Sequence, residues 1–351
     1  MSLFGHLNSD AQKSMKHRLG RWDFCPPGIT LKEKKFMKVM GIVAGRHNGN
    51  SEILVKEALS AVQEAGGECS LINLFDYHIE PCLGCEACTM SMGDVAMGKG
   101  DYKGCVLQEK DDMDKIVTAM REQDAIIIGC PTYDLMPSSL YLRFAQRFLA
   151  YELSFLIKIG KVKRDPHLVA GVIAVGGSCH DWQTLSLECI GATMFTQSIK
   201  VVDQMMSTRN GRPGNVLLRP EQIERAHKMG ENIVKSVNTP YEERTWLGDP
   251  DMGLCPNCHS SLVFKGEPHW DGIQFPFECA VCGAGGDLVR DENGEVKFVL
   301  AENGLCRDRN VNESRDLHLD EIIATRIDFM KNQASVQEAY KKYKEMKFPA
   351  V

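Results

Sequence analysis

From residue 38 to residue 236 the sequence alternates between short apolar segments and segments with helical periodicity. Apolar segments of strand length occur at 38–44, 68–74, 125–129, 167–175 and 199–205. Helical periodicity is found at 51–65, 113–121, 139–150, 184–195 and 221–236. Strands and helices in this order form a doubly wound parallel sheet with right-handed crossovers. We therefore predict an α/β domain with five parallel strands at residues 38–240.

Length and composition leave room for more than this domain. The 351 residues, 43% hydrophobic content and net charge of −6 are ordinary for a globular chain. The longest apolar stretches, at 125–128 and 168–175, are too short to cross a membrane, so we expect neither a membrane span nor a membrane partner. Residues 1–37 form a basic extension without an apolar signal core. We expect it to be a loosely ordered or dimer-embracing arm.

The 14 cysteines point to metal binding rather than to disulfides, because many occur as Cys-x2-Cys pairs. This usage predicts a reducing cytoplasm. Cys82, Cys85 and Cys88 place three thiolates on one tight loop, as an iron–sulfur cluster requires. Cys105 follows after 16 intervening residues rich in glycine and is the candidate fourth ligand. Zinc on the same thiolates, or a reduced loop without metal, are the alternatives.

Three loops follow the first, third and fourth strands, where ligands bind to sheets of this kind. The first, at 45–51, ends at a helix N-terminus, where amides and the helix dipole favour a phosphate. The candidate hydrogen-bond donors to such a phosphate are Arg46, Asn48, Asn50 and Ser51. The loop matches neither a Walker A motif nor the dinucleotide fingerprint. A capped strand-to-helix turn without a ligand is the alternative.

The other two loops carry groups that suit a planar ring. The candidate ring contacts after the third strand are Pro131, Thr132, Tyr133 and Asp134, and those after the fourth are Gly176, Gly177, Ser178 and Trp182. Tyr133 and His180 are also candidate proton donors. Ring packing by Tyr133 and a backbone hydrogen bond to His180 would explain both residues without chemistry.

Together these segments resemble the iron–sulfur flavoprotein branch of the flavodoxin-like NADPH-dependent FMN reductase superfamily. The resemblance covers about residues 38–205. It rests on AGRHNGNS at 44–51, PCLGCEAC at 81–88, GC at 104–105 before DDM at 111–113, PTY at 131–133 and GG at 176–177. The gap between Cys88 and Cys105 is longer than in the compact motif of that branch.

The resemblance implies a sheet order of 2-1-3-4-5 and an FMN cofactor. The first loop would hold the FMN phosphate, Pro131 to Tyr133 would line the ring and ribityl chain, and Gly176 and Gly177 would border the ring. Cys82, Cys85, Cys88 and Cys105 would hold a [4Fe-4S] cluster. It also implies a homodimer or homotetramer in which one subunit's cluster faces another's flavin.

A separate module is expected at 246–305. Two Cys-x2-Cys pairs, Cys255 with Cys258 and Cys279 with Cys282, are separated by 20 residues. This spacing predicts a four-thiolate ribbon that holds zinc or, alternatively, a rubredoxin-like iron. Its acidic balance argues against a nucleic-acid partner. We expect the ribbon, with Trp246 and Trp270, to brace the flavin domain or a subunit interface.

The final segment, 306–351, contains helical periodicity at 319–346 and predicts a docking or dimerisation helix. The expected function of the whole chain is an FMN-dependent oxidoreductase that passes electrons between a [4Fe-4S] cluster and FMN to a small molecule or redox protein. A cluster-free NAD(P)H-dependent reductase of flavins, quinones or nitro compounds is one alternative. A non-enzymatic redox sensor is another.

Overall fold

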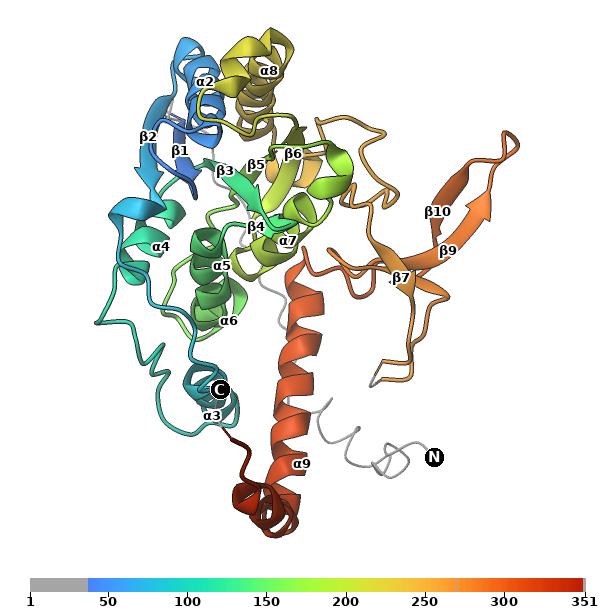
Figure 1. Cartoon of the computed structure of the whole chain (residues 1–351). Helices are drawn as coiled ribbons and strands as arrows, with labels where there is room; N and C mark the ends of the chain where they lie inside the picture. The colour runs from blue at the N-terminus through green and yellow to red at the C-terminus, as the bar shows by residue number, and fades with distance from the viewer. Residues whose placement is uncertain (1–36, 270, 350–351) are drawn as a thin grey trace. The chain divides into compact units, whose positions relative to one another are not determined.

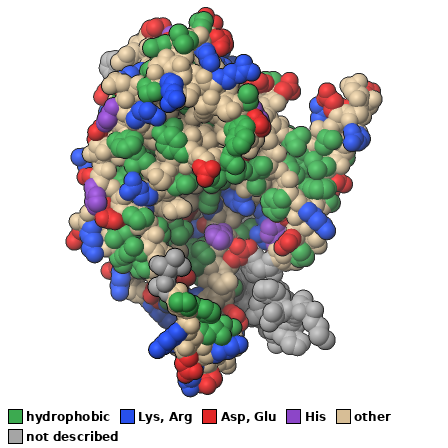
Figure 2. All heavy atoms as spheres, viewed as in Figure 1, with side chains coloured by type: hydrophobic (Ala, Val, Ile, Leu, Met, Phe, Trp, Pro, Cys, Tyr) green, Lys and Arg blue, Asp and Glu red, His purple; other side chains and the backbone are tan. Residues whose placement is uncertain are grey.

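A computed structural model of the protein describes residues 37–269 and 271–349. The predicted N-terminal extension therefore lies outside the described residues, apart from Met37, as does Trp270. Within the described residues, no helix combines the length and apolar character that crossing a membrane requires. Acidic and basic side chains are interspersed on the face drawn in Figure 2, so neither sign of charge dominates that face.

Five parallel strands form the central sheet (Figure 1). In spatial order they are β2 Glu68–Asn73, β1 Lys38–Val43, β3 Ala125–Tyr133, β5 Val169–Val175 and β6 Lys200–Ser207. The short strand β4 Met136–Pro137 folds back on the end of β3 in an antiparallel pair. When β4 is left out and the five parallel strands are numbered along the chain, their order is 2-1-3-4-5, which confirms the predicted order. β3 and β5 are buried over most of their length, as strands covered on both faces must be.

Helices cover both faces of this sheet. Helices α2 Asn50–Glu64 and α8 Pro220–Val237 pack on one face, against Val39, Ile127 and Ile173. The other face is covered by α4 Met113–Arg121, α5 Ser139–Gln146 and α7 Ser186–Met194. The two layers are visible in Figure 1. The strand-to-helix alternation read from the sequence thus corresponds to the observed architecture.

Several element boundaries differ from the prediction. The loop after Cys85 contains a helix, α3 Ala87–Ala96, which begins after Glu86 turns the chain in a left-handed conformation (φ 57°). The helix expected at 139–150 ends at Gln146 and continues as a 3₁₀ helix, Arg147–Tyr151, before α6 Leu153–Lys158. β3 extends to Tyr133 because its last residues pair with β4.

The C-terminal region contributes a small antiparallel sheet and a long helix. The sheet has the order β10-β9-β8-β7. Its strands are β7 Val263–Lys265, β8 Phe277–Cys279, β9 Gly285–Arg290 and β10 Val296–Leu300. Helix α9 spans Asn312–Glu345 and starts earlier than the predicted residue 319.

Helix α9 is attached to the flavodoxin-like domain along its first half. Arg315 is buried and donates to Ser198 Oγ at 2.6 Å. Arg326 donates to the carbonyl oxygen of Met90 and to the carboxylate of Asp94, both at 2.7 Å. Because Met90 and Asp94 belong to α3, α9 supports the helix that carries Cys88.

Helices α2 and α8 approach closely at Gly230. A Cβ atom at this position would lie 2.1 Å from the carbonyl oxygen of Ala58. We expect Gly230→Ala to lower the free energy of unfolding by about 1–3 kcal/mol, because backbone atoms must move apart. Urea denaturation measures the change. The control Glu224→Ala, at an exposed position of α8, should change it by less than about 0.5 kcal/mol, and equal values for both variants would contradict the close approach.

Candidate functional site

Loops at the carboxyl ends of the central strands enclose a pocket of about 240 Å³. Because the strands are parallel, these loops lie at one edge of the sheet. Of the predicted cofactor residues, those that line this pocket are Arg46, Asn50, Ser51, Pro131, Thr132, Tyr133 and Gly177. The structure therefore brings the first, second and third predicted loops together.

One end of this pocket is built on the N-terminus of α2. The helix begins after Gly49, where a Cβ atom would lie 2.9 Å from Arg46 Cγ, so the tight turn requires glycine. The first amides of a helix have no partner within it and can bind an anion. The Ser51 hydroxyl and Arg46 guanidinium border the same space. The arrangement suits a phosphate group.

Glu52 is a buried acid in the first turn of α2, next to this anion site. Burial favours its neutral form, but hydrogen bonds from Lys56, the Asn48 amide and Asn73 outweigh burial and lower the pKa of Glu52. Its Oε1 accepts from Lys56 Nζ at 2.6 Å. The ion pair reduces the repulsion that this carboxylate would exert on a bound anion.

Asn50 holds a loop that the sequence analysis missed. Its Nδ2 donates to the carbonyl oxygens of Asn210 and Arg212, both at 2.8 Å. Its Oδ1 accepts from the Val216 amide at 3.3 Å. Residues 210–213, which follow β6, thereby form a further wall of the pocket and add Arg212 near the anion site. The sequence signal for this loop was the run of Asn, Gly and Pro residues after the last strand of the parallel sheet.

A second pocket of about 230 Å³ adjoins the first and shares Thr132 and Gly177 with it. The predicted residues that line it are Thr132, Asp134, Gly176, Gly177, Ser178 and Trp182. Leu135, which was not predicted, completes this lining. Tyr133 and Trp182 are 51% and 61% exposed, so both rings have a free surface at the pocket mouths. Flat apolar molecules can pack on such rings.

The turn between β3 and β4 fixes this mouth. Asp134 and Leu135 both have positive φ, at 49° and 69°, as a two-residue hairpin of type I′ requires. Leucine is an unfavourable residue in this conformation. Asn48 and His180 line neither of the two pockets, and the roles of Tyr133 and His180 in proton transfer stay predictions.

All four cysteines of the first motif line a third pocket, of about 260 Å³. Cys82 and Cys85 are exposed, whereas Cys88 and Cys105 are half-buried. Burial raises the pKa of the Cys88 thiol, and the nearby Cys105 and Cys82 add to this effect. Apolar side chains form much of the remaining wall. Four thiols around one cavity provide the donor set that an iron–sulfur cluster takes.

Arg147 forms part of the wall of this cysteine pocket. It is 2% exposed, forms an ion pair with Asp111 and donates to the carbonyl oxygen of Glu80 at 2.9 Å. The carboxylate also accepts from the amides of Glu80 and Met113. Burial would raise the pKa of Asp111, but these hydrogen bonds, led by that of Arg147, lower it. The network fixes the chain two residues before Cys82 and places a cation beside the thiols.

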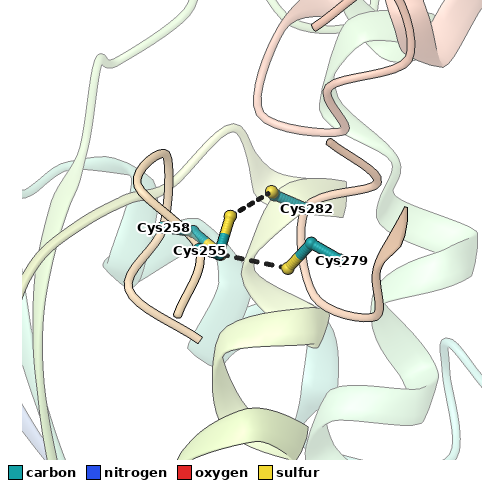
Figure 3. Close-up of side chains that lie close together, drawn as sticks. All are labelled: Cys255, Cys258, Cys279 and Cys282. Atoms are coloured by element: carbon teal, nitrogen blue, oxygen red, sulfur yellow. Dashed lines mark hydrogen bonds between the residues drawn. The ribbon is translucent and has the colours of Figure 1, made fainter. Parts of the chain in front are cut away.

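The second group of cysteines is compact. The sulfur atoms of Cys255, Cys258, Cys279 and Cys282 all lie within 4.8 Å of one another, as Figure 3 shows. Cys255 Sγ lies 3.7 Å from Cys282 Sγ, and Cys258 Sγ lies 3.6 Å from Cys279 Sγ. Tetrahedral zinc with bonds of about 2.3 Å to sulfur needs sulfur separations of about 3.8 Å. The geometry therefore fits a single metal ion.

The two cysteine pairs adopt the same turn. The amide of His259 donates to the Cys255 carbonyl at 2.8 Å, and that of Gly283 donates to the Cys279 carbonyl at 3.0 Å. Both donors have positive φ, at 56° and 80°. The ring of Trp246 stacks on His259 at 4.3 Å between ring centroids, so the tryptophan packs against the ribbon.

Arg147→Met tests the buried ion pair. We expect it to lower the free energy of unfolding by about 3–5 kcal/mol at pH 7, because the Asp111 carboxylate would stay buried without its cation. Because the pKa of Asp111 is lowered in the folded protein, the pair contributes its full stabilisation above the pKa of an unfolded aspartate, about 3.9. This contribution decreases as the pH falls below that value.

Urea denaturation at pH 7 and at pH 3 measures both effects. The difference in the free energy of unfolding between the wild type and Arg147→Met should be smaller at pH 3 than at pH 7. The exposed control Arg164→Met should leave the stability within about 0.5 kcal/mol at either pH. An Arg147→Met variant as stable as this control would show that the pair is dispensable.

Comparisons with known proteins agree with these features. Residues 37–181 match the model of a family described as NADPH-dependent FMN reductase. An iron–sulfur flavoprotein of Methanocaldococcus jannaschii is 31% identical over 209 residues, which cover 57% of this chain and 97% of the relative. A flavone synthase of Aspergillus candidus is 29% identical over 283 residues, which cover 76% of this chain and 83% of the relative.

Among solved structures, one described as a flavone reductase matches with a TM-score of 0.68 and 23% sequence identity. The match covers 90% of this chain and all of that one. This share is larger than residues 1–240, so the common fold includes part of the C-terminal region as well as the parallel sheet.

Proposed function

This chain belongs to the NADPH-dependent FMN reductase family, together with iron–sulfur flavoproteins, and we propose that it passes electrons between a [4Fe-4S] cluster and FMN. That it is a flavin-dependent oxidoreductase follows from the family. The cluster, its ligands and the acceptor are our proposal. A flavin accepts two electrons together and releases them singly, and a cluster carries one at a time.

The observation that carries the proposal is the shared pocket of Cys82, Cys85, Cys88 and Cys105. Cys82 and Cys85 lie in the loop before α3, Cys88 lies in its first turn and Cys105 follows it, and the fold brings all four to one cavity. Four thiolates and their iron carry net negative charge, which the buried guanidinium of Arg147 would partly offset. Exposed Cys82 and Cys85 leave one side of the cavity open to a redox partner or to a second subunit of a homo-oligomer.

FMN would occupy the two joined pockets. The N-terminus of α2, with Arg46 and Ser51, would bind its phosphate, and Arg212 would add a second positive charge. Pro131 to Tyr133 would contact the ring on one side, with Gly176 and Gly177 at its border. Glycine at position 177 lets the chain lie close to the 210–213 loop, because a Cβ atom there would lie 3.0 Å from Gly211 Cα. NAD(P)H or a ferredoxin-like protein would be the electron donor.

Metal analysis of protein purified without oxygen tests the proposal. We expect about four irons, matching acid-labile sulfide, one FMN and one zinc per chain. Cys105→Ser should lose most of the iron and sulfide while it keeps its FMN and zinc. Cys189→Ser, a half-buried cysteine on α7 outside the pocket, is the matched control and should keep all of them. Protein that contains zinc and FMN but no iron would refute the cluster.

A second candidate function is a cluster-free NAD(P)H-dependent reductase of flat, conjugated molecules such as quinones, nitro compounds or flavones. It is favoured by the flavone synthase, which matches a larger share of this chain than the iron–sulfur flavoprotein does. The free rings of Tyr133 and Trp182 would suit such a substrate.

The double variant Cys82→Ser with Cys85→Ser separates the two functions. If electrons pass through the cluster, this variant should bind FMN but lose at least about 90% of the turnover with a one-electron redox partner. If the second function holds, NAD(P)H-dependent reduction of flavone or a quinone should proceed at the wild-type rate. Stopped-flow measurement of flavin absorbance under anaerobic conditions follows both reactions.

A further inference from the structure

Helix α7 contacts a residue that lines the joined pockets at one position and the C-terminal cysteine ribbon at another. Ser186 Oγ lies 2.7 Å from Oγ1 of Thr132, which lines both joined pockets. Two residues later, the carboxylate of Glu188 accepts from Ser260 Oγ at 2.5 Å and from the Ser261 amide at 2.9 Å. Ser260 and Ser261 directly follow the Cys255–Cys258 turn.

The ribbon holds these two donors through its cysteine turn. The Cys255 amide donates to the Ser260 carbonyl at 3.0 Å, and the Leu262 amide donates to Ser260 Oγ at the same distance. Ser260 is only 3% exposed. The apolar core of the ribbon consists largely of cysteines, with Ala284 and Phe298. A module with so small a core depends on bound metal for its folding, so the metal determines where Ser260 and Ser261 lie.

The pocket wall is continuous with α7. Gln183 is fully buried just before the helix, and its Nε2 donates to the Ser178 carbonyl at 3.2 Å. A Cβ atom at Gly176 would lie 2.3 Å from Gln183 Oε1, so this side chain packs directly behind the glycine. Leu187 and Ile190 anchor α7 in the core. A shift of the first turn of α7 would therefore move the wall from Gly176 to Trp182.

Glu188 is placed to transmit such a shift. Burial raises the pKa of its carboxyl, while the hydrogen bonds from Ser260 and Ser261 and the charge of His180 act against the increase. Both hydrogen bonds to the carboxylate come from the ribbon. If the ribbon loses its fold, a half-buried carboxylate loses these partners, which costs more free energy than the loss of an exposed contact.

We infer that Glu188 is a positioning residue through which metal in the Cys255, Cys258, Cys279 and Cys282 site holds the wall of the flavin pocket in its binding geometry. The inference rests on the proposed FMN site. Emptying the metal site would weaken FMN binding although no ligand of that metal lines either joined pocket.

The test compares FMN dissociation constants of full-length variants, measured by quenching of FMN fluorescence. Cys282→Ser empties the metal site, and Glu188→Ala removes the contact on the α7 side. We expect each to weaken FMN binding about tenfold, which corresponds to the loss of one hydrogen bond to a charged group. The double variant should be no weaker than Cys282→Ser alone, because both changes break the same path. Glu224→Ala, on exposed α8 surface, should bind FMN as the wild type does.

Zinc and iron content provide readouts that are independent of activity. Cys282→Ser should lose its zinc and keep its iron, whereas Glu188→Ala should keep both. If Glu188→Ala does not fold, Ser260→Ala breaks the same contact from the ribbon side. Three results would overturn the inference. They are a wild type without metal in this site, a Cys282→Ser variant with unchanged FMN affinity, and a double variant whose loss of FMN affinity is the product of the two single losses. A wild type that binds no FMN would instead refute the proposed function.

Discussion

The parallel direction of five strands is the constraint on which the candidate flavin site depends. Each crossover returns the chain to the same end of the sheet, so the loops after β1, β3, β5 and β6 meet at one edge. Residues distant in sequence, such as Ser51 and Arg212, thereby border one pocket. Burial of the strands on both faces keeps this edge rigid, while the loops supply the groups that contact a ligand.

Electrostatics shapes both candidate cofactor regions in a similar way. Next to the α2 N-terminus, Lys56 neutralises buried Glu52. Next to the four thiols, Asp111 orients Arg147, whose Nη1 also donates to the Glu80 carbonyl and so holds the chain before Cys82. In each case a base forms a pair with a buried acid. The charge that faces the first pocket is then set by the backbone amides of α2, and the charge that faces the cysteine pocket is set by the Arg147 guanidinium. The Arg147–Asp111 pair, buried on both sides, is costly to break by removing one partner.

Periodicity and motif spacing were sufficient to predict the parallel sheet, the helices on its two faces and the convergence of the three loops, because these follow from local pattern and from the geometry of parallel sheets. The order of the strands was implied by the family resemblance. The pairing of the two C-terminal Cys-x2-Cys turns was equally accessible. Helix α3 was missed, since its sequence is short and interrupted by glycine. Arg147, Asn50 as a loop anchor, and Glu188 could not be assigned, because each acts through partners 36 to 166 residues away.

Helix α9 has a consequence for the order of events during synthesis. Arg326 binds the carbonyl of Met90 and the carboxylate of Asp94, more than 230 residues earlier in the chain. During synthesis the support for α3 therefore emerges from the ribosome only after α3 itself, the sheet and the ribbon. Until Arg326 emerges, a nascent chain would present Cys88 on a helix that is still incompletely held. Insertion of a cofactor there would accordingly follow the synthesis of α9.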